Sequence, residues 1–309
     1  MAIVRALCSQ TAKPFEIVIV DSSLQGGVCP AEIEVVCSAS NIKLKYEHRE
    51  RAFPGNARNI GLDLASGELI AFIDVQTIPR LNWLEASSLR LLEGRGYFGV
   101  LGATCFNAQN RFESLVRDGF YGAFPRRTLP GSVFRREVFV MAGRFIDWAR
   151  AGEDTEWMLR LEVLRISTVY SSSALVDYVG LIGTDIKQLL KKWFRNYAAS
   201  RALPHFFPQK LLLWIVIYPL LLLIAFNWNY LIADWRMDSP LYIGHVTKTA
   251  AFLPMLIYVI VRGLMLPLRR GVDIWRLLPI RFVAIAFVCC VADFVKILVF
   301  SLPHRKYED

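Results

Sequence analysis

The first two thirds of the chain alternate short apolar segments with polar ones. Compact runs rich in β-branched residues predict buried strands at Phe15–Val20, Ile42–Tyr46, Leu69–Ile73, Tyr97–Phe106 and Ile166–Tyr170. Apolar residues at helical spacing predict helices between them, at Pro54–Ala65, Leu81–Leu92 and Gly152–Leu164. Strands that alternate with helices predict an α/β fold with a ligand site at the carboxyl ends of its strands.

The last third consists of long apolar runs. Leu211–Ala233 contains no charged residue. As a helix it would be about 35 Å long, enough to cross a hydrocarbon core of about 30 Å. Two further runs follow, Thr249–Leu266 and Phe282–Leu302, the second interrupted by Asp293 and Lys296. The sequence therefore predicts about three transmembrane helices, at about 211–233, 249–266 and 282–302.

Basic residues gather beside these runs, between 187 and 210 and again between 269 and 281. The positive-inside rule places both segments in the cytoplasm. We therefore expect an integral protein of the inner or plasma membrane whose N-terminal domain is cytoplasmic.

Asp185–Leu203 combines apolar residues at helical spacing with lysine and arginine. This composition is typical of an interfacial helix that lies on anionic lipid, although a surface helix packed on the domain has a similar pattern. The predicted organisation is a domain over 1–183, an amphipathic segment over 184–210 and a transmembrane region over 211–309.

The composition agrees with this division. The chain is 54% hydrophobic and 20% charged, and its 19 glycines, 14 prolines and 6 cysteines are ordinary for 309 residues, which excludes a disordered or disulfide-dense chain. No cysteine pair has C-x-x-C spacing, so neither a zinc site nor a redox dithiol is predicted. The net charge of +9 is explained by membrane anchoring, and we expect no nucleic acid partner.

Polar residues follow several of the predicted strands and open the last predicted helix. Asp21 closes the first strand, Asp74 closes the strand at 69–73, and Glu153 and Asp154 begin the helix at 152–164. Each has an ordinary structural explanation, because aspartate stabilises turns and acidic residues complement a helix dipole. Their joint order along the chain is what favours a functional site.

Three segments carry a family resemblance. They are FEIVIVDSS at Phe15–Ser23, ARNIGLDLASGELIAFIDVQTIPRLNWLE at Ala57–Glu85 and AGRFIDWARAGEDTEWMLRL at Ala142–Leu161. In this order and at this spacing they resemble the family 2 glycosyltransferases, which have the GT-A fold. The resemblance covers about residues 1–165, and a membrane tail is common among members that act on lipid-linked or envelope acceptors.

The resemblance implies a binding site for a nucleotide-sugar donor. Asp21, with Ser23 nearby, would bind the nucleoside, and Arg58 and Asn59 would lie close to the nucleotide. The forked guanidinium of arginine suits a diphosphate, to which it donates two hydrogen bonds. Asp74, in the carboxylate motif at the end of its strand, would meet the ribose and a divalent metal that bridges the phosphates.

The resemblance also implies a metal and a catalytic base. In most members an Asp-x-Asp motif binds a divalent cation, Mg²⁺ or Mn²⁺, and the corresponding residues here are Asp74 and Gln76. The Glu-Asp pair near the acceptor would be Glu153 and Asp154, with Asp154 as the base that deprotonates the incoming hydroxyl.

The sequence departs from the family pattern in three places. Gln76 replaces the usual metal-binding aspartate, which weakens the expected affinity for a cation. The segment from Gln188 to Trp193 only approximates the Gln-x-x-Arg-Trp motif of processive synthases, which favours addition of a single sugar. Members also have a strand before the segment at 10–21, so we expect the Phe15–Val20 strand to lack a partner along one edge.

The leading hypothesis is a membrane-anchored, inverting glycosyltransferase. It would move one sugar from a nucleotide-sugar donor to a lipid-linked or cell-envelope glycan acceptor at the cytoplasmic face. A catalytically silent relative that acts as a membrane scaffold or sugar-nucleotide binder is the alternative, and a polyprenyl-phosphate glycosyltransferase is a third hypothesis. The donor sugar, the base and the acceptor do not follow from the sequence.

Overall fold

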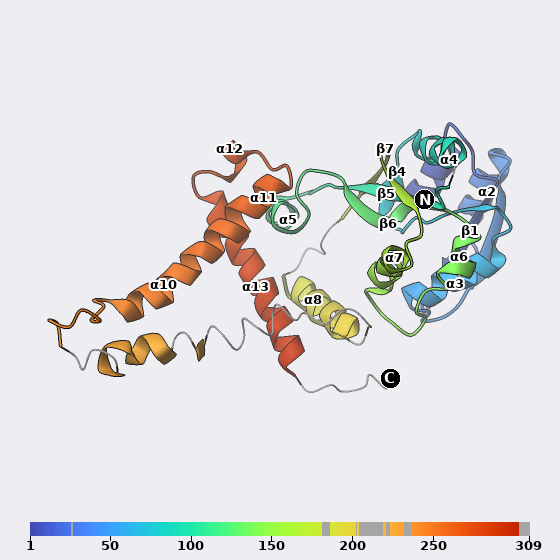
Figure 1. Cartoon of the computed structure of the whole chain (residues 1–309). Coiled ribbons are helices and arrows are strands. Elements are labelled where there is room, and N and C mark those ends of the chain that lie inside the picture. Colours follow the sequence, from blue (N-terminus) through green and yellow to red (C-terminus); the bar gives the residue numbers. More distant parts are fainter. Residues whose placement is uncertain are drawn as a thin grey trace. The chain divides into compact units, whose positions relative to one another are not determined.

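The computed structural model divides the chain into two compact units (Figure 1). One contains Met1–Arg117 and Ala123–Phe206, and the other contains Asp118–Gly122 and Phe207–Asp309. The structure describes residues 1–25, 27–94, 96–180, 186–201, 203, 219–220, 223–231 and 236–302. We treat the first unit as the α/β domain and the second as the helical unit.

The α/β domain contains two sheets. Strands β1 (Glu16–Asp21) and β2 (Lys43–His48) pair in parallel, with Asp21 opposite His48. Five strands form the second sheet in the order β3-β6-β5-β7-β4. Their bounds are Leu69–Ala71 for β3, Thr77–Pro79 for β4, Gly99–Phe106 for β5, Arg126–Arg135 for β6 and Thr168–Tyr178 for β7. Only the β5–β7 pairing in this sheet is parallel.

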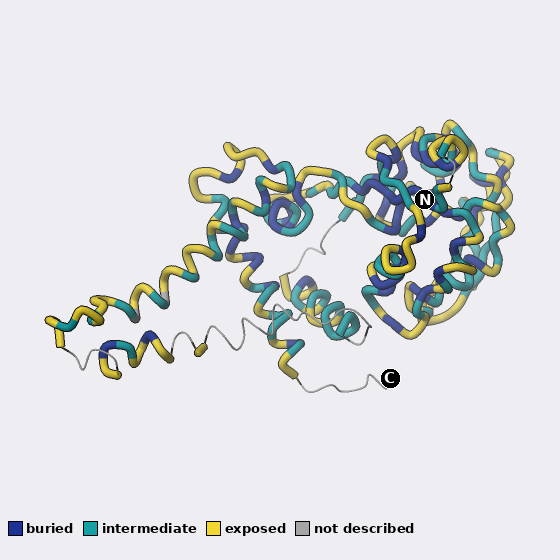
Figure 2. The backbone as a smooth tube through the Cα atoms, in the orientation of Figure 1, coloured by how far each residue is buried: buried dark blue, intermediate teal, exposed yellow. Residues whose placement is uncertain are grey.

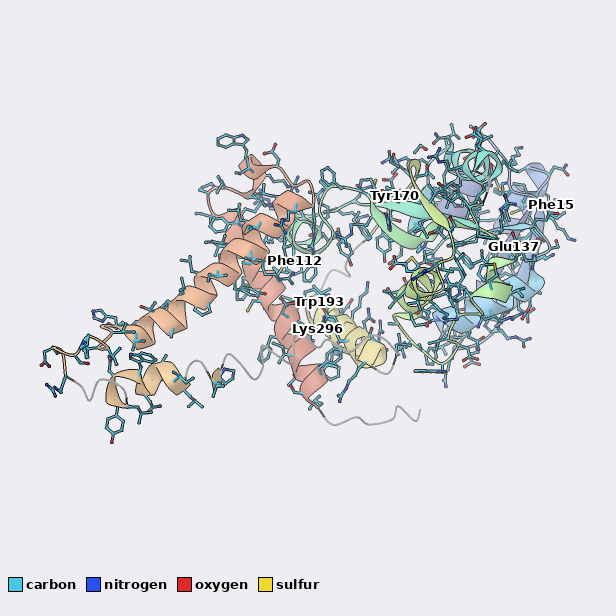
Figure 3. All side chains as sticks on the ribbon, viewed as in Figure 1. Phe15, Phe112, Glu137, Tyr170, Trp193 and Lys296 are labelled. Atoms are coloured by element: carbon cyan, nitrogen blue, oxygen red, sulfur yellow. The ribbon has the colours of Figure 1, made fainter. Side chains whose placement is uncertain are left out.

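Eight described helices accompany these sheets. They are α1 (Ala2–Cys8), α2 (Ala31–Ala39), α3 (Pro54–Leu64), α4 (Trp83–Glu93), α5 (Arg111–Val116), α6 (Val138–Met141), α7 (Glu153–Val163) and α8 (Ile186–Arg201). Helices α3, α4 and α7 confirm the three helices that the spacing of apolar residues predicts. Helix α8 lies within the predicted amphipathic segment and carries Trp193 (Figure 3).

An aromatic cluster forms the centre of the larger core. Trp157 of α7 is fully buried, and its ring lies 4.8 Å from that of Phe145 and 5.0 Å from that of Phe134. Strands β5 and β6, which cross this core, consist mainly of buried residues (Figure 2). Aromatic pairs of this kind stabilise a core beyond their buried area. The cluster therefore fixes α7 and the loop before it against the sheet.

A buried carboxylate joins the two sheets. Glu16 of β1 accepts hydrogen bonds from the N–H groups of Ser66 and Gly67, which precede β3, and its Oε2 lies 2.6 Å from Lys45 Nζ on β2. In the described part of the chain β2 is the only strand that pairs with β1. Within the described residues, β1 therefore pairs along one edge only, as the sequence predicts.

The helical unit contains two long apolar helices. One is continuous over Lys248–Arg269 and the other is α13 (Arg281–Ser301); both are long and apolar enough to cross a membrane by length and composition. The first comprises α10 (Val246–Val259), the π-helix η2 (Ile260–Met265) and α11 (Leu266–Arg269). About half of the first predicted span, 211–233, lies outside the described residues, and its described residues 219–220 and 223–231 are helical. Two candidate spans, rather than three, are therefore found among the described helices.

A short insertion from between β5 and β6 belongs to this helical unit. It includes most of the π-helix η1 (Arg117–Tyr121), whose Asp118 is fully buried. The carboxylate of Asp118 accepts hydrogen bonds from Arg276 at 3.1 Å and from Arg281 at 2.9 Å. Arg276 belongs to α12 (Ile274–Leu277). These charged hydrogen bonds hold the insertion between the helices.

Candidate active site

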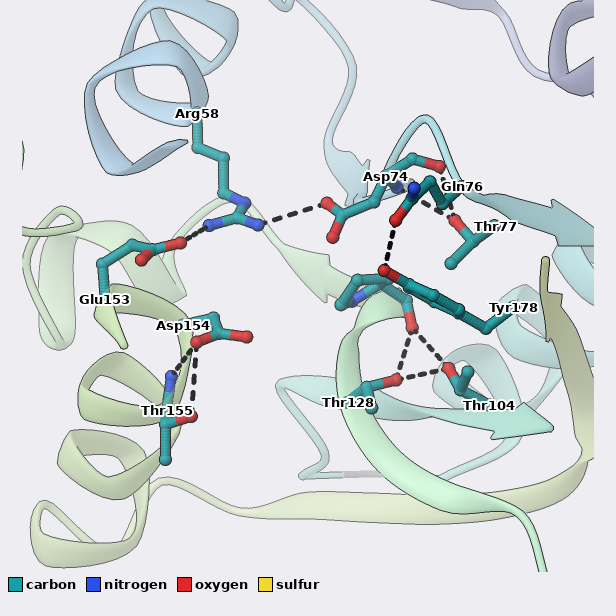
Figure 4. Close-up of polar contacts among 11 residues, drawn as sticks. Arg58, Asp74, Gln76, Thr77, Thr104, Thr128, Glu153, Asp154, Thr155 and Tyr178 are labelled. Atoms are coloured by element: carbon teal, nitrogen blue, oxygen red, sulfur yellow. Dashed lines mark hydrogen bonds and ion pairs between the residues drawn. The ribbon is translucent and has the colours of Figure 1, made fainter. Parts of the chain in front are cut away.

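A buried arginine joins two carboxylates from separate elements. Arg58 of α3 donates from Nη2 to Oδ1 of Asp74, which follows β3, at 3.2 Å. Its Nη1 donates to Oε1 of Glu153, the first residue of α7 (Figure 4). The side chains of Arg58 and Glu153 are 13% and 5% exposed, whereas that of Asp74 is 42% exposed. Of the three groups, only Asp74 is open to a ligand.

The start of α3 explains why these residues meet. Pro54 occupies the first turn of the helix, where its missing N–H costs nothing. At Gly55 an added Cβ would lie 1.9 Å from the carbonyl oxygen of Ile146, so only glycine permits this approach. Asn59, one turn further on, hydrogen-bonds both backbone polar groups of Phe145. Helix α3 is thus fixed against the loop that leads to α7, and this brings Arg58 to Glu153.

The electrostatics of the trio keep Arg58 charged. Burial lowers the pKa of Arg58, but the neighbouring carboxylates of Asp74 and Glu153 outweigh burial and raise it. Burial raises the pKa of Glu153. A buried charge that is paired on both sides is costly to move, because either partner would be left unpaired. Glu153 is therefore a poor candidate for the base and a good one for holding Arg58 in place.

Asp154 lies beside the trio and differs from Glu153 in its surroundings. It is half-buried, and its Oδ1 accepts hydrogen bonds from the N–H and the hydroxyl of Thr155, at 2.7 and 3.2 Å. The negative charge of Asp154 contributes to the raised pKa of Arg58. No hydrogen bond to Asp154 Oδ2 is found within the described residues. A carboxylate oxygen in this situation can accept a proton from a bound hydroxyl.

Gly152, just before α7, adopts a left-handed conformation with φ of 90°. An added Cβ there would lie 2.8 Å from Leu203 Cδ1, beyond the end of α8, and 3.1 Å from the Ser200 hydroxyl. The end of α8 and Leu203 are therefore packed against the residue that precedes Glu153 and Asp154.

Asp21 lies in a separate polar cluster at the end of β1. Its carboxylate accepts hydrogen bonds from the Ser23 N–H at 2.9 Å, the Ser23 hydroxyl at 3.1 Å and the Tyr46 hydroxyl at 2.7 Å. The Ser23 N–H and then Tyr46 lower the pKa of Asp21, which stays ionised. The structure thus brings Asp21 and Ser23 together as predicted. Two residues of β2 in this cluster were not predicted, because the register of β1 and β2 places them here. They are Tyr46 and His48, whose Nε2 lies 2.9 Å from the Ser23 carbonyl oxygen.

Gln76 has a partner that the sequence does not reveal. Tyr178, the last residue of β7, donates its hydroxyl hydrogen to Gln76 Oε1 (Figure 4). The two residues meet because Thr77 of β4 pairs with Tyr178 across the sheet. The Thr77 hydroxyl lies 3.0 Å from the Asp74 N–H and 2.7 Å from the Asp74 carbonyl oxygen, and so holds the turn that contains Gln76. No motif marks Tyr178, which lies a hundred residues away along the chain.

The predicted metal ligands offer little to a cation. Asp74 supplies one carboxylate, already beside the Arg58 guanidinium, and Gln76 supplies an amide oxygen that accepts from Tyr178. Among the described residues no group of three or more His, Cys, Asp or Glu is placed to hold a metal ion. Hard divalent cations prefer several oxygen ligands with net negative charge, so the residues present do not fit such an ion.

Comparisons with known proteins show what the chain is similar to. Residues 2–139 match the family described as Glycosyl transferase family 2. The chain is 26% identical over 202 residues to the glycosyltransferase AglE of Haloferax volcanii, a match that covers 62% of this chain and 64% of the relative. It is 25% identical over 158 residues to an uncharacterized glycosyltransferase of Rickettsia felis, covering 49% of this chain and 26% of that protein. The matched part is thus shorter than two thirds of either relative.

A solved structure shares the fold. The mannosyltransferase PcManGT of Pyrobaculum calidifontis, in complex with GDP-Man and Mn²⁺, matches with a TM-score of 0.50 at 14% identity. The match covers 95% of this chain and 81% of that one. Residues 2–139 are therefore similar to the Glycosyl transferase family 2, and the α/β domain has a GT-A-like fold.

Proposed function

We propose that this protein is a membrane-anchored glycosyltransferase that moves a single sugar from a nucleotide-sugar donor to a lipid-linked or cell-envelope glycan acceptor, with inversion. One observation carries the proposal, and it lies in a domain whose residues 2–139 match family 2. Arg58 joins Asp74 and Glu153. Asp154 lies beside them, and one of its carboxylate oxygens accepts no hydrogen bond from the described residues. The relatives found are named as glycosyltransferases, which supports the same class of reaction.

The donor would bind between the ends of β1 and β3. Asp21, held ionised by Ser23 and Tyr46, is suited to accept hydrogen bonds from the nucleoside, and Asp74 is open to the ribose and diphosphate. The solved mannosyltransferase binds GDP-Man, a donor of the class that we propose here.

In the reaction, the acceptor hydroxyl oxygen attacks the anomeric carbon of the donor sugar. Asp154 takes the proton of this hydroxyl, and the bond from the anomeric carbon to the diphosphate breaks with its electron pair remaining on the leaving nucleoside diphosphate. Attack from the face opposite to the leaving group inverts the configuration. General-base assistance of this kind typically contributes about 10²–10⁴-fold in rate. Glu153 acts on the reaction by positioning Arg58.

The membrane part of the proposal is supported by the two apolar helices and by α8. The charges beside the helices favour a cytoplasmic catalytic domain at the inner or plasma membrane. Helix α8 carries lysine and arginine between apolar residues, and burial lowers the pKa of Lys192. Contact of this segment with membrane lipids would bring a lipid-linked acceptor close to Asp154, because Leu203 packs against Gly152.

A catalytically silent relative that binds sugar nucleotides is the second candidate, and the replacement at Gln76 favours it. Transfer assays with a panel of nucleotide sugars separate the two. The purified chain is mixed with membranes, or with polyprenyl phosphate as a defined acceptor, and release of nucleoside diphosphate is measured. We expect release with one donor and only when acceptor is present. Donor binding without release under all conditions would favour the silent relative, and transfer to polyprenyl phosphate alone would identify the acceptor class.

A further inference from the structure

The turn after β3, which contains Asp74 and Gln76, has less negative charge than a metal-binding turn with two carboxylates. Two carboxylates there would repel a diphosphate unless a cation lay between them. Of the two residues at this turn, Asp74 and Gln76, only Asp74 has a carboxylate, and the Arg58 guanidinium lies 3.2 Å from it. Gln76 is neutral. The turn therefore presents a compensated carboxylate and an amide, to which an anion can come close.

Arg58 cannot give way to a metal ion at this place. It is buried, with 13% of its side chain exposed, and Glu153 holds its other nitrogen. Asn59 and Gly55 fix the helix that carries it. A divalent cation bound to Asp74 would therefore lie within a few ångströms of an immobile positive charge, and the repulsion between the two disfavours it.

Tyr178 decides which end of the Gln76 amide is available. Its hydroxyl donates to Gln76 Oε1, so the amide oxygen faces Tyr178. The amide NH₂ of Gln76 is left to donate elsewhere, and it has no protein acceptor among the described residues. Gln76 is exposed, so this nitrogen can donate to an incoming oxyanion.

We propose that the nucleoside diphosphate binds this domain without a divalent metal ion, with Arg58 compensating Asp74 and the Gln76 amide, oriented by Tyr178, donating to a phosphate oxygen. The inference rests on the proposed function, since it concerns the donor of that reaction. In this arrangement Gln76 is a binding residue and Tyr178 is a positioning residue that acts through it.

The first measurement is the affinity for each of the uridine, guanosine, adenosine, cytidine and thymidine diphosphates, by calorimetry on the full chain in detergent, with Mn²⁺ and with EDTA. We expect the nucleotide that binds most tightly to have dissociation constants that agree within about threefold in the two conditions. Binding that weakens more than about tenfold in EDTA would overturn the inference. If none of the five nucleotides binds in either condition, the proposed function fails and the inference fails with it.

Two variants test the roles of the side chains. Gln76→Asp adds an uncompensated carboxylate, so diphosphate binding should weaken in EDTA and recover with Mn²⁺. Tyr178→Phe removes the hydrogen bond that orients Gln76, so it should weaken diphosphate binding by about 3–10-fold, the worth of one ordinary hydrogen bond, and leave binding of the free nucleoside unchanged. Tyr170→Phe removes a hydroxyl from the same strand and should change neither. Equal loss of diphosphate and nucleoside binding in Tyr178→Phe would show a purely structural role and overturn the positioning of Gln76.

Discussion

Asn59 makes both hydrogen bonds that the peptide groups of Phe145 offer. Its Nδ2 donates to the Phe145 carbonyl oxygen at 2.9 Å, and its Oδ1 accepts from the Phe145 N–H at 3.1 Å. The residue beside it on α3 is Arg58, whose guanidinium bonds Glu153. Asn59 therefore fixes, through the backbone, the distance between the two elements that hold the ion pair. Family resemblance assigned Asn59 to the nucleotide; the structure gives it a supporting contact.

Changing this amide to a carboxylate should disturb both stability and the site. In Asn59→Asp an oxygen replaces the donating nitrogen and faces the Phe145 carbonyl oxygen, which costs about 1–3 kcal/mol in free energy of unfolding. We expect a lower thermal unfolding midpoint and reduced transfer. Asn56→Asp is the matched control, because it places the same charge in the first turn of the same helix, where the dipole favours it. Equal destabilisation by both variants would contradict the role of the Phe145 contacts.

The sequence predicts this site to a useful extent because its residues lie at the ends of regular elements. Strand β1, helix α3, the turn after β3 and the start of α7 all fall where the apolar pattern places them. Strand β6 was not predicted, because Pro130 and Gly131 in its middle are typical of a turn. In the sheet they lie where the register between β5 and β6 shifts, which tolerates a proline.

Partners supplied by distant strands could not be predicted. Tyr178 reaches Gln76 only because β4 pairs with the end of β7, and Tyr46 reaches Asp21 only through the register of β1 and β2. The apolar pattern fixes which face of a strand is buried, but it does not fix the neighbouring strand. The expected metal site at Asp74 and Gln76 depends on such contacts, because Arg58 bonds Asp74 and Tyr178 bonds Gln76. The apolar pattern predicts neither contact.

Asp154 and Glu153 should respond differently to loss of charge. Asp154→Asn keeps the size of the side chain and removes the base, so transfer should fall by about 10²–10⁴-fold with donor affinity nearly unchanged. Steady-state rates and calorimetric binding of the donor measure the two quantities separately. Glu162→Gln, an exposed change on the same helix, is the control and should leave both unchanged. A parallel loss of donor affinity in Asp154→Asn would mean that Asp154 binds the nucleotide.

Stability should depend on pH through Glu16. Burial opposes ionisation, but Lys45 and the N–H groups of Ser66 and Gly67 outweigh burial and lower the pKa of Glu16 to about 2. Because the pKa is lowered on folding, this stabilisation is present above about pH 4.5 and is lost as the pH falls toward 2. The shift corresponds to about 3 kcal/mol at neutral pH.

The variant Glu16→Gln isolates this contribution. Its unfolding midpoint should lie well below that of the unchanged protein at pH 7, and the gap should narrow as the pH falls from 4.5. Glu93→Gln changes an exposed carboxylate at the end of α4 and should shift the midpoint little at any pH. A gap for Glu16→Gln that stays constant over the acidic range would show that packing, rather than charge, makes the contribution.

Two glycines of α3 offer the sharpest comparison of stability with site geometry. In Gly55→Ala the new methyl group would lie 1.9 Å from the Ile146 carbonyl oxygen and 3.3 Å from Glu153 Cγ, so α3 must move away from the loop before α7. In Gly61→Ala the nearest atom is Val20 Cγ2 at 3.8 Å, an ordinary contact. The helix gains about 0.4–1 kcal/mol from alanine wherever the methyl group fits. Gly61→Ala should therefore raise the unfolding midpoint and leave transfer intact, whereas Gly55→Ala should lower the midpoint and reduce donor binding by separating Arg58 from Glu153. If Gly55→Ala proved as stable and active as Gly61→Ala, the close approach of α3 to Ile146 would not be what holds the site together.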